Sequence, residues 1–345
     1  MQKLTSGVLD STSPNSTYGT ILGQERFVPT IKEDRTPLDG IGTPEKSSEN
    51  GNFVVDNYER IGRFDFSRLK VDSLPTGFVC FDKHFVLKRS KPQLVTVAAF
   101  TSHGKTALMM QLASNISKHG PVFVHSFEMT QGDLETRIVA AIANTPSEKI
   151  MRGEISEEKL EAARVEYAKR QLYLCKSTEN TVNYIQTSCY EKAKQVGKPL
   201  LIVVDYIQLM RSVVRQDQRT RDIADSMRGL KTLAEQLECP ILIGSQLNRE
   251  CEKRGKAIEQ RKGIGEYRPI ISDLAESSAI AHDSDVVLFV TRQHQYDGTR
   301  ENQADILCSK NRSGQTFEEV MQWSGELCSF YENGTKTAML GGHGI

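Results

Sequence analysis

The stretch from Leu94 to Ala113 decides the fold, and it reads Leu94-Val-Thr-Val-Ala-Ala99-Phe-Thr-Ser-His-Gly104-Lys105-Thr106-Ala-Leu-Met-Met-Gln-Leu-Ala113. Its first part is apolar and β-branched and predicts a buried strand, and its last part predicts a helix. A strand, a loop ending in Gly-Lys-Thr and a helix make a Walker A motif, in which backbone N–H groups at a helix N-terminus hold phosphate. The residues predicted to bind the nucleotide are Ser102, His103, Gly104, Lys105, Thr106 and Ala107.

The motif departs from its usual pattern at one position. Ala99 stands where the first glycine of G-x-x-x-x-G-K-[ST] is expected, and the loop accepts alanine there only if the φ angle of Ala99 stays negative. The other key residues are in place. Lys105 is expected to reach the β and γ phosphates, and the Thr106 hydroxyl is expected to bind Mg²⁺.

Two carboxylates follow predicted strands. Pro199-Leu-Leu-Ile-Val-Val-Asp205 predicts a buried central strand that ends in an acid, as a Walker B motif does, so Asp205 is expected to hold Mg²⁺ directly or through water. Glu128 comes directly after the strand expected over 122–127. Ligands of open α/β sheets bind beyond the carboxyl ends of the strands, so Glu128 is predicted to polarise an attacking water. A neighbour of a helix N-cap is the other interpretation of Glu128.

Short β-branched runs alternate with helical periodicity from about residue 70 onward. This pattern predicts an α/β fold, a P-loop NTPase core with a mostly parallel central sheet and helices on both faces. The clearest helix is expected over 219–237, where apolar residues recur on one face. The expected strands are Leu94–Ala99, Val122–Ser126, Leu200–Asp205, Ile241–Ser245, Asp285–Val290 and Ala304–Ser309.

Composition excludes several classes of protein. The 44 Lys and Arg residues balance 44 Asp and Glu residues, so any nucleic-acid binding must come from a local patch. No apolar run approaches the roughly 20 residues that cross a bilayer, and residues 1–16 lack the apolar stretch of a secretory signal, so a cytoplasmic protein is expected. The seven cysteines show no C-x-x-C spacing, which argues against a zinc ribbon.

Further motifs, taken with the two Walker motifs, resemble the C-terminal motor domain of DnaB-type replicative DNA helicases, which has a RecA-like core. The resemblance covers about Asp72 to Tyr331. Its most specific string is Gly244-Ser-Gln246-Leu-Asn-Arg249, similar to the family's Ser-Gln-Leu-Asn-Arg, which other RecA-like ATPases do not usually carry. The other matching strings are Ser126-Phe-Glu128-Met with Arg137 two turns on, Val204-Asp205-Tyr-Ile-Gln-Leu-Met210, Ser272-Asp-Leu-Ala-Glu-Ser-Ser-Ala-Ile and Lys310-Asn-Arg312-Ser-Gly314.

The resemblance implies a role for each matching residue. Glu128 would be the catalytic base, and Gln246 would sense the γ-phosphate of ATP. Lys310 and Arg312 would reach the nucleotide of a neighbouring subunit, with Arg312 as the arginine finger, which places active sites between subunits. Spacing alone favours a solvated β-hairpin turn for these two residues, because Arg-Ser-Gly is good turn chemistry. The cofactors implied are ATP and Mg²⁺.

A basic stretch, residues 249–268, is the first candidate for DNA contact. It carries seven positive residues against four glutamates, and its three glycines predict a mobile loop that tracks a phosphate backbone. A solvated loop without a ligand is the alternative. Residues 211–221 are a second candidate. Ala275 and Ser278 replace an arginine and a glycine of the family pattern, which weakens the DNA prediction. The residues predicted to lie at the DNA are Arg249, Lys253, Arg254, Arg261, Lys262 and Glu276.

The expected domain organisation has four parts. Residues 1–55 are rich in Ser, Thr, Pro, Gly and Asn and predict a disordered tail. Residues 56–70 resemble the remnant of a linker helix, residues 71–332 form the RecA-like ATPase motor domain, and residues 333–345 form a C-terminal tail. The helical domain that precedes the motor in the family is not expected, because residues 1–70 are too short and too polar to form it.

The leading hypothesis is an ATP-driven, ring-forming replicative helicase that translocates on single-stranded DNA and unwinds duplex. The resemblance implies a homo-oligomer, in this family a hexamer, with a primase, a polymerase or a helicase loader as further partners. The first alternative is a RecA-like ATPase that drives assembly or regulation without unwinding. The others are a non-catalytic partner of a helicase and a recombinase.

Overall fold

The computed structural model describes residues 19–21, 24–26, 73–84, 86–175, 179–211, 219–248, 268–274, 278–298 and 300–333. The chain divides into two units, Met1–Phe64 and Asp65–Ile345. In the first unit, β1 (Gly19–Ile21) and β2 (Gln24–Arg26) pair as an antiparallel ribbon. The predicted tails and linker helix lie largely outside the described residues, so their boundaries stay predictions.

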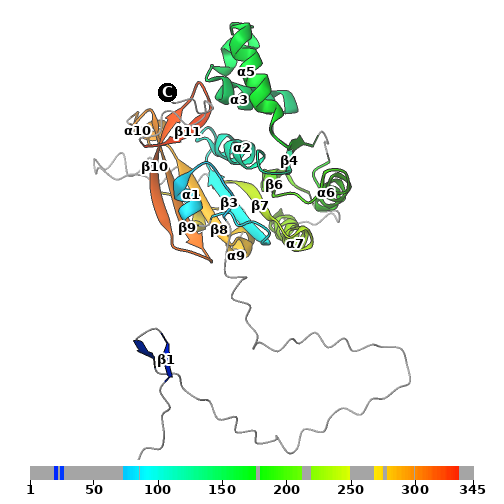
Figure 1. The fold of residues 1–345 in the computed structure, drawn as a ribbon, viewed down its shortest axis with the longest axis vertical. Coiled ribbons are helices and arrows are strands. Elements are labelled where there is room, and N and C mark those ends of the chain that lie inside the picture. Colours follow the sequence, from blue (N-terminus) through cyan, green and yellow to red (C-terminus); the bar gives the residue numbers. More distant parts are fainter. Residues whose placement is uncertain are drawn as a thin grey trace, which may run out of the picture. The chain divides into compact units, whose positions relative to one another are not determined.

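The second unit is built on a nine-stranded sheet with the order β11-β10-β9-β8-β3-β7-β6-β4-β5 (Figure 1). The strands from β8 to β5 in this order run parallel, and β9, β10 and β11 continue the sheet as an antiparallel meander. The strands are β3 (Gln93–Ala99), β4 (Val122–Ser126), β5 (Leu172–Leu174), β6 (Leu201–Asp205), β7 (Pro240–Gln246), β8 (Val286–Thr291), β9 (Gln303–Asn311), β10 (Phe317–Ser324) and β11 (Ser329–Glu332).

The predicted fold class is confirmed. Each expected strand is present, with ends that differ by at most two residues, and the expected helix is α7 (Arg219–Leu237). Strands β5, β10 and β11 were not expected. β5 is a short edge strand whose residues are only half-buried, and β10 exposes Glu318 and Glu319, so neither shows the apolar pattern of a buried parallel strand.

Hydrophobic clusters lie on both faces of the sheet. Alternate residues of β3 belong to different clusters, Val95 and Val97 to one and Leu94 and Ala98 to the other. The first cluster is covered by α1 (Val79–Lys83) and α2 (Lys105–Ile116). The second is covered by α6 (Val182–Val196), α7 and α9 (Ser278–Asp283), so helices protect both faces as predicted.

A helical subdomain is inserted between β4 and β5. It contains α3 (Gln131–Ala143), α4 (Ser147–Met151) and α5 (Glu157–Ala168), which stand away from the sheet in Figure 1. The subdomain has its own small core, formed by Ile138, Ile142, Ala143 and Ala163. The remaining short helix, α10 (His294–Asp297), follows β8.

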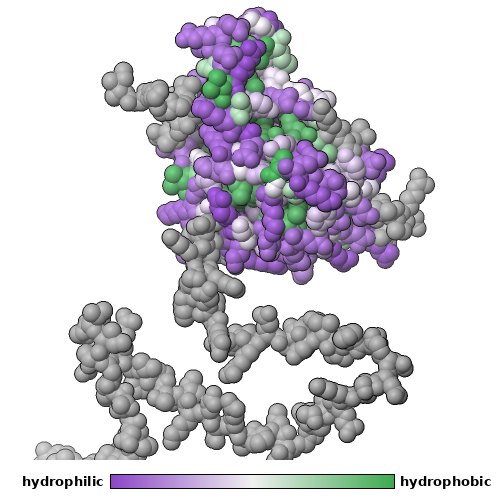
Figure 2. All heavy atoms as spheres, turned by 45° about the vertical axis from the view of Figure 1, so that its right-hand side comes forward, coloured by the Kyte–Doolittle hydropathy of each residue, from purple (hydrophilic) through white to green (hydrophobic). Residues whose placement is uncertain are grey.

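The face shown in Figure 2 is mostly hydrophilic, with apolar side chains in small scattered patches. Single exposed apolar residues are ordinary on a folded domain. Over the described ranges, no helix has the length and apolarity that a membrane span requires.

The buried imidazole of His125 on β4 makes the stability of the fold depend on pH. His125 is 3% exposed, its Nε2 lies 3.3 Å from Cys189 Sγ, and its Nδ1 has no hydrogen-bond partner among the described residues. Burial lowers the pKa of His125 from 6.5 to about 4. The unfolded chain therefore binds a proton between these pH values that the folded chain does not, and the free energy of unfolding falls as pH drops through this window.

We predict that the free energy of unfolding decreases by about 2 kcal/mol from about pH 6.5 to about pH 5, at about 1.4 kcal/mol per pH unit. His125→Leu should remove this contribution and leave a flatter dependence. Urea unfolding of both proteins across this pH range measures the difference. Equal slopes for the two proteins would show that His125 does not titrate as its burial requires.

Candidate active site

The loop between β3 and α2 takes its shape from two left-handed residues. Ser102 has a φ of 66° and Gly104 a φ of 99°, so the chain turns sharply before the first turn of α2. Ala99 is the last residue of β3 and has no positive φ, which confirms the condition under which alanine fits this position.

Gly104 is also required by close packing. A Cβ atom at Gly104 would lie 2.7 Å from Cζ of Phe330 on β11. Phe330 cannot easily move, because it is fully buried and because the Gln111 side chain on α2 accepts from its N–H and donates to its C=O, both at 2.9 Å. The loop therefore packs at Gly104 against the fixed ring of Phe330.

Asp205 at the end of β6 is a fully buried carboxylate with two partners from the loop. Lys105 Nζ lies 2.9 Å from its Oδ1, and the Thr106 hydroxyl donates to its Oδ2 at 2.7 Å. The same ammonium lies 4.0 Å from the centre of the Tyr206 ring. Gly244 on β7 leaves room for this carboxylate, since a Cβ there would lie 2.6 Å from Asp205 Oδ1. A buried charge needs such partners, so the two Walker motifs are held together by their own chemistry.

A cavity of about 110 Å³ opens above the loop and is lined by five of the six residues predicted to bind the nucleotide, together with Glu128 and Gln246. Its lining residues are Ala99, Phe100, Thr101, Ser102, Gly104, Lys105, Thr106, Ala107, Glu128, Tyr206 and Gln246. His103 does not line the cavity. Its ring is buried, and its Nδ1 accepts a hydrogen bond from the backbone N–H of Arg292 at 3.0 Å. The His103 side chain therefore supports the loop.

Glu128 reaches the cavity because β4 and β6 end together. Ser126 pairs with Asp205, and the Phe127 N–H donates to the Asp205 carbonyl at 2.9 Å. The Glu128 side chain is exposed and makes no hydrogen bond or ion pair with the part of the chain that the structure describes. A free carboxylate at the rim of a cavity is suited to accept a proton from water.

Gln246, the last residue of β7, reaches the loop from the strand that pairs with β3. Its Nε2 donates to the Thr101 hydroxyl at 3.0 Å, and its backbone pairs with Ala99 of β3. The side chain thus touches the phosphate loop through a polar contact.

Sequence analysis missed two residues that support the loop, Arg292 and Trp323. Arg292 Nη1 donates to the Ser102 carbonyl at 3.3 Å, and the guanidinium lies 5.0 Å from the centre of the Trp323 ring. The position of Arg292 directly after the apolar strand β8 was a usable signal, because the carboxyl ends of parallel strands meet at the site. Trp323 lies on β10, a strand that was not expected, so its sequence position gave no such signal.

Lys310 and Arg312 lie at the opposite end of the strands from the loop. Arg312 lies in the turn after β9, and its backbone N–H donates to the Asp285 carbonyl at 2.9 Å. The Asp285 N–H in turn donates to Leu94 at the start of β3, at 2.8 Å. The loop follows Ala99 at the other end of β3, about 16 Å away at about 3.3 Å per residue. Arg312 therefore cannot complete the cavity of its own chain.

The side chains of this cluster make contacts within the chain and are not simply solvated. Arg312 pairs with Asp285 at 3.1 Å and donates to the His282 carbonyl at 2.8 Å, and Lys310 donates to the Ala281 carbonyl at 2.7 Å. Burial alone raises the pKa of Asp285, but hydrogen bonds from Leu94, Lys231 and Arg312 outweigh it and hold that pKa below its usual range. Both cations lie at the C-terminal end of α9, which the helix dipole favours.

The residues predicted at DNA, Arg249, Lys253, Arg254, Arg261, Lys262 and Glu276, all lie outside the described residues. The described flanks show where these segments leave the sheet. Residues 249–267 follow the carboxyl end of β7, and residues 212–218 follow that of β6 through η2 (Ile207–Leu209). Both segments therefore follow strands whose carboxyl ends lie at the cavity.

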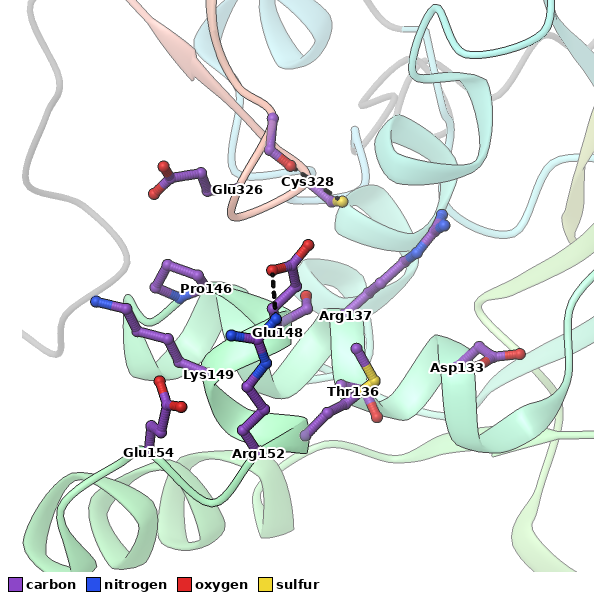
Figure 3. Close-up of a pocket in the computed structure, with 13 residues that line it drawn as sticks. Asp133, Thr136, Arg137, Pro146, Glu148, Lys149, Arg152, Glu154, Glu326 and Cys328 are labelled. Carbon is purple, nitrogen blue, oxygen red and sulfur yellow. Dashed lines mark hydrogen bonds and ion pairs between the residues drawn. The ribbon is translucent and has the colours of Figure 1, made fainter.

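A larger cleft of about 570 Å³ lies between α3, α4 and the turn joining β10 to β11 (Figure 3). Arg137, which belongs to the family resemblance, lines this cleft and not the cavity above the loop. Charges of both signs line it, including the pair Arg152 and Glu148 at 3.6 Å. The cleft therefore has no net preference for an anion.

The residues around Asp205 fit a magnesium ion. The Thr106 hydroxyl and the Asp205 carboxylate lie 2.7 Å apart and offer the hard oxygen ligands that Mg²⁺ takes together with substrate phosphates. Elsewhere in the described ranges, no group of three or more His, Cys, Asp or Glu side chains could hold a metal by itself. The site thus suits an ion that arrives with a nucleotide.

Comparison with known proteins agrees with this geometry. The family model described as "DnaB-like helicase C terminal domain" matches residues 73–332. The chain belongs to this family. It is 32% identical over 321 residues to the replicative DNA helicase DnaB of Haemophilus influenzae, covering 89% of this chain and 64% of that protein. It is 34% identical over 264 residues to a probable plasmid replicative DNA helicase of Chlamydia muridarum, covering 75% of this chain and 54% of that protein.

Solved structures of DnaB-like proteins share the fold. The ATPase domain of G40P aligns with a TM-score of 0.69 and 27% identity, over 75% of this chain and 91% of that one. A DnaB-like replicative helicase, described with its interactions with primase, aligns with a TM-score of 0.67 and 28% identity, over 75% of this chain and 63% of that one. The chain spans 64% of the length of the Haemophilus influenzae protein and 54% of the length of the Chlamydia muridarum protein.

We predict that Gly104→Ala lowers the free energy of unfolding by about 2 kcal/mol or more, through backbone strain and a clash with Phe330, and abolishes nucleotide binding. Gly132→Ala is the matched control. A Cβ at Gly132 on α3 meets no atom within 4 Å, so that variant should stay within about 1 kcal/mol of wild type. Urea unfolding and the fluorescence of a labelled ATP analogue measure both effects. Normal nucleotide binding by Gly104→Ala would contradict the packing described here.

Proposed function

We propose that this chain is an ATP-driven, ring-forming replicative DNA helicase of the cytoplasm, which translocates on single-stranded DNA and unwinds duplex. The observation that carries the proposal is the separation within one chain of two halves of an active site. One end of the parallel strands carries the cavity, which is lined by Lys105, Thr106, Glu128 and Gln246. Arg312 lies at the other end of the strands. The names of the relatives, replicative DNA helicases, support the same reaction for this chain.

In the proposed reaction, the chain's own residues bind and orient ATP. Lys105 exchanges part of its ion pair with Asp205 for the phosphates, while Thr106 and Asp205 hold Mg²⁺. The bound ion would offset negative charge on the phosphates. As water bonds to the γ-phosphorus and the bond to the ADP oxygen breaks, Glu128 accepts the proton of the water, and ADP leaves. Gln246 exchanges its contact with Thr101 for one with the γ-phosphate. Ser102, Gly104 and Ala107 shape the loop around the phosphates.

We propose that a neighbouring subunit supplies Lys310 and Arg312. A ring brings the β9–β10 turn of one subunit to the cavity of the next, where Arg312 stabilises the charge that develops on the transferred phosphoryl group. Such a finger is worth roughly 10³- to 10⁵-fold in rate. In the isolated chain Arg312 is held by Asp285, so assembly has to offer it a stronger anionic partner.

The partner we propose is single-stranded DNA, held by the basic residues that follow β7. Because the segment 249–267 begins three residues after Gln246, hydrolysis at the cavity can be coupled to movement of the proposed DNA-binding segment. Hexameric assembly and an interaction with a primase, polymerase or loader are proposed by analogy. One related structure is described with its interactions with primase.

The second candidate is a RecA-like ATPase that drives assembly without unwinding. The zero net charge favours it, because the chain as a whole does not attract DNA. The two candidates differ in whether DNA changes the rate of hydrolysis.

We predict that single-stranded DNA stimulates ATP hydrolysis by about 10-fold or more, since DNA would order the ring and bring Arg312 to the next cavity. Lys105→Ala and Arg312→Ala should each abolish the stimulated rate, and Arg312→Ala should still bind ATP. Steady-state hydrolysis with and without an oligothymidylate measures this.

Mixing the two inactive variants provides the control. Lys105→Ala retains the finger and Arg312→Ala retains the cavity, so mixed rings should recover activity at the interfaces that combine the intact halves. Hydrolysis that does not respond to DNA would overturn the helicase and favour the assembly ATPase. Mixed rings without activity would contradict a finger supplied by the neighbour.

A further inference from the structure

Gln208, in η2 after the Walker B strand, makes an unusual set of hydrogen bonds with the end of β7. Its Oε1 accepts from the Gln246 N–H at 3.1 Å, and its Nε2 donates to the Gln246 carbonyl at 3.3 Å and to the Ser245 hydroxyl at 3.0 Å. One carboxamide therefore serves both backbone polar groups of Gln246.

The sheet explains why Gln246 needs this partner. On one side, β3 pairs with β7 as far as Ala99 and Gln246. On the other side, the pairing of β6 with β7 stops at Val204 and Ile243, because the chain leaves the strand after Asp205. The Gln208 carboxamide occupies the place of the missing strand. An unpaired buried backbone group would otherwise cost about 1 to 3 kcal/mol.

The three hydrogen bonds from the Gln208 carboxamide to Ser245 and Gln246, here called the clamp, fix the direction of the Gln246 side chain. With its backbone held from both sides, Gln246 is left to contact Thr101 in the phosphate loop and to line the cavity beside Lys105 and Glu128. The hydrogen bonds of Gln208 thus connect η2 to the residue that contacts the phosphate loop.

Gln208 and Gln246 each lie a few residues before a segment proposed for DNA contact. It follows Asp205 by three residues, and the backbone of Arg211, where the segment 212–218 begins, is held by the Asn180 carbonyl at 2.9 Å. Gln246 precedes the segment 249–267 by three residues, and the Asn248 N–H donates to Asp273 of η3 (Ile271–Asp273) at 2.9 Å. The clamp thus joins the two stretches of chain that lead into these segments, one ending at Arg211 and the other at Asn248.

We propose that Gln208 is a positioning residue that holds Gln246 in register with the phosphate loop and so couples the nucleotide to the described residues from which the two segments proposed for DNA contact continue. This inference rests on the proposed function, because it assigns Gln208 a part in coupling the same cavity to DNA. It requires no contact between Gln208 and the nucleotide. Its effect is on turnover and on the response to DNA, and not on binding of ATP.

The test compares Gln208→Leu and Gln208→Glu with Gln186→Leu in the full chain. Gln186 donates a single carboxamide hydrogen bond, to the Gly229 carbonyl at 3.2 Å between α6 and α7, so its loss measures an ordinary structural cost. For both Gln208 variants we expect a KM for ATP within about 3-fold of wild type, a kcat about 10-fold lower and a loss of most of the stimulation by oligothymidylate. Gln186→Leu should keep wild-type kinetics.

A pH profile separates positioning from a general loss of stability. Glutamate at position 208 lacks the donors to Gln246 and Ser245, but protonation returns one O–H donor. The activity of Gln208→Glu relative to wild type should therefore rise as the pH falls from about 6 towards about 4.3, the ordinary pKa of a glutamate side chain. Gln208→Leu has nothing to titrate and should show no such rise.

The outcomes are distinguishable from failure of the proposed function. Wild-type hydrolysis that ignores DNA overturns the helicase, yet the split between KM and kcat can still be read from the basal rate. Gln208 variants that match Gln186→Leu in kcat overturn the positioning role. So does a loss of the folded state in both Gln208 variants, detected by circular dichroism, because Gln208 would then be a structural residue only.

Discussion

The buried carboxylate of Asp205 is the constraint on which the site depends. With no exposed surface, this carboxylate is stable only beside donors, and Lys105 and Thr106 supply them from the loop that follows β3. This requirement fixes the ends of β3 and β6 relative to each other, although β7 lies between them. It also explains the small residue at Gly244, because any Cβ there would meet the carboxylate. Nucleotide chemistry and fold stability therefore draw on the same contacts.

The second organising feature is the length of β3. The phosphate loop lies at one end of this strand, and the cluster of Asp285, Lys231 and Arg312 lies at the other. A chain that carries its cavity and the arginine proposed as a finger at opposite ends of the strands is suited to a head-to-tail ring, in which each interface joins unlike surfaces. Gln208 and Gln246 add a connection in the other direction, from the cavity towards the segments that leave β6 and β7.

The sequence was sufficient where apolar pattern and motif chemistry agree. The six buried strands, α7 and the loop residues follow from β-branched runs, a helical period and the Gly-Lys-Thr string, each of which reflects local physics. The sequence could not predict β5 or β10, whose half-exposed residues lack that pattern, nor the contacts of Arg292 with Ser102 and Trp323, which join distant segments. The role of Gln208 was also hidden, because an uncharged amide shows no signal until its partner strand is placed. The interpretation of Lys310 and Arg312 as a solvated turn gave too little weight to the α9 carbonyls that hold them.

The most direct test of this account is the magnesium dependence of ATP binding, measured by calorimetry for wild type and for Asp205→Asn. We predict that excess EDTA weakens ATP binding by wild type by about 10-fold or more, and that folded Asp205→Asn binds ATP almost equally with and without the ion. Asparagine retains the shape of the side chain but offers one neutral oxygen, so it should lose the ion before it loses the nucleotide. Full magnesium dependence in Asp205→Asn would contradict the assignment of Asp205 as the residue on which the site is built.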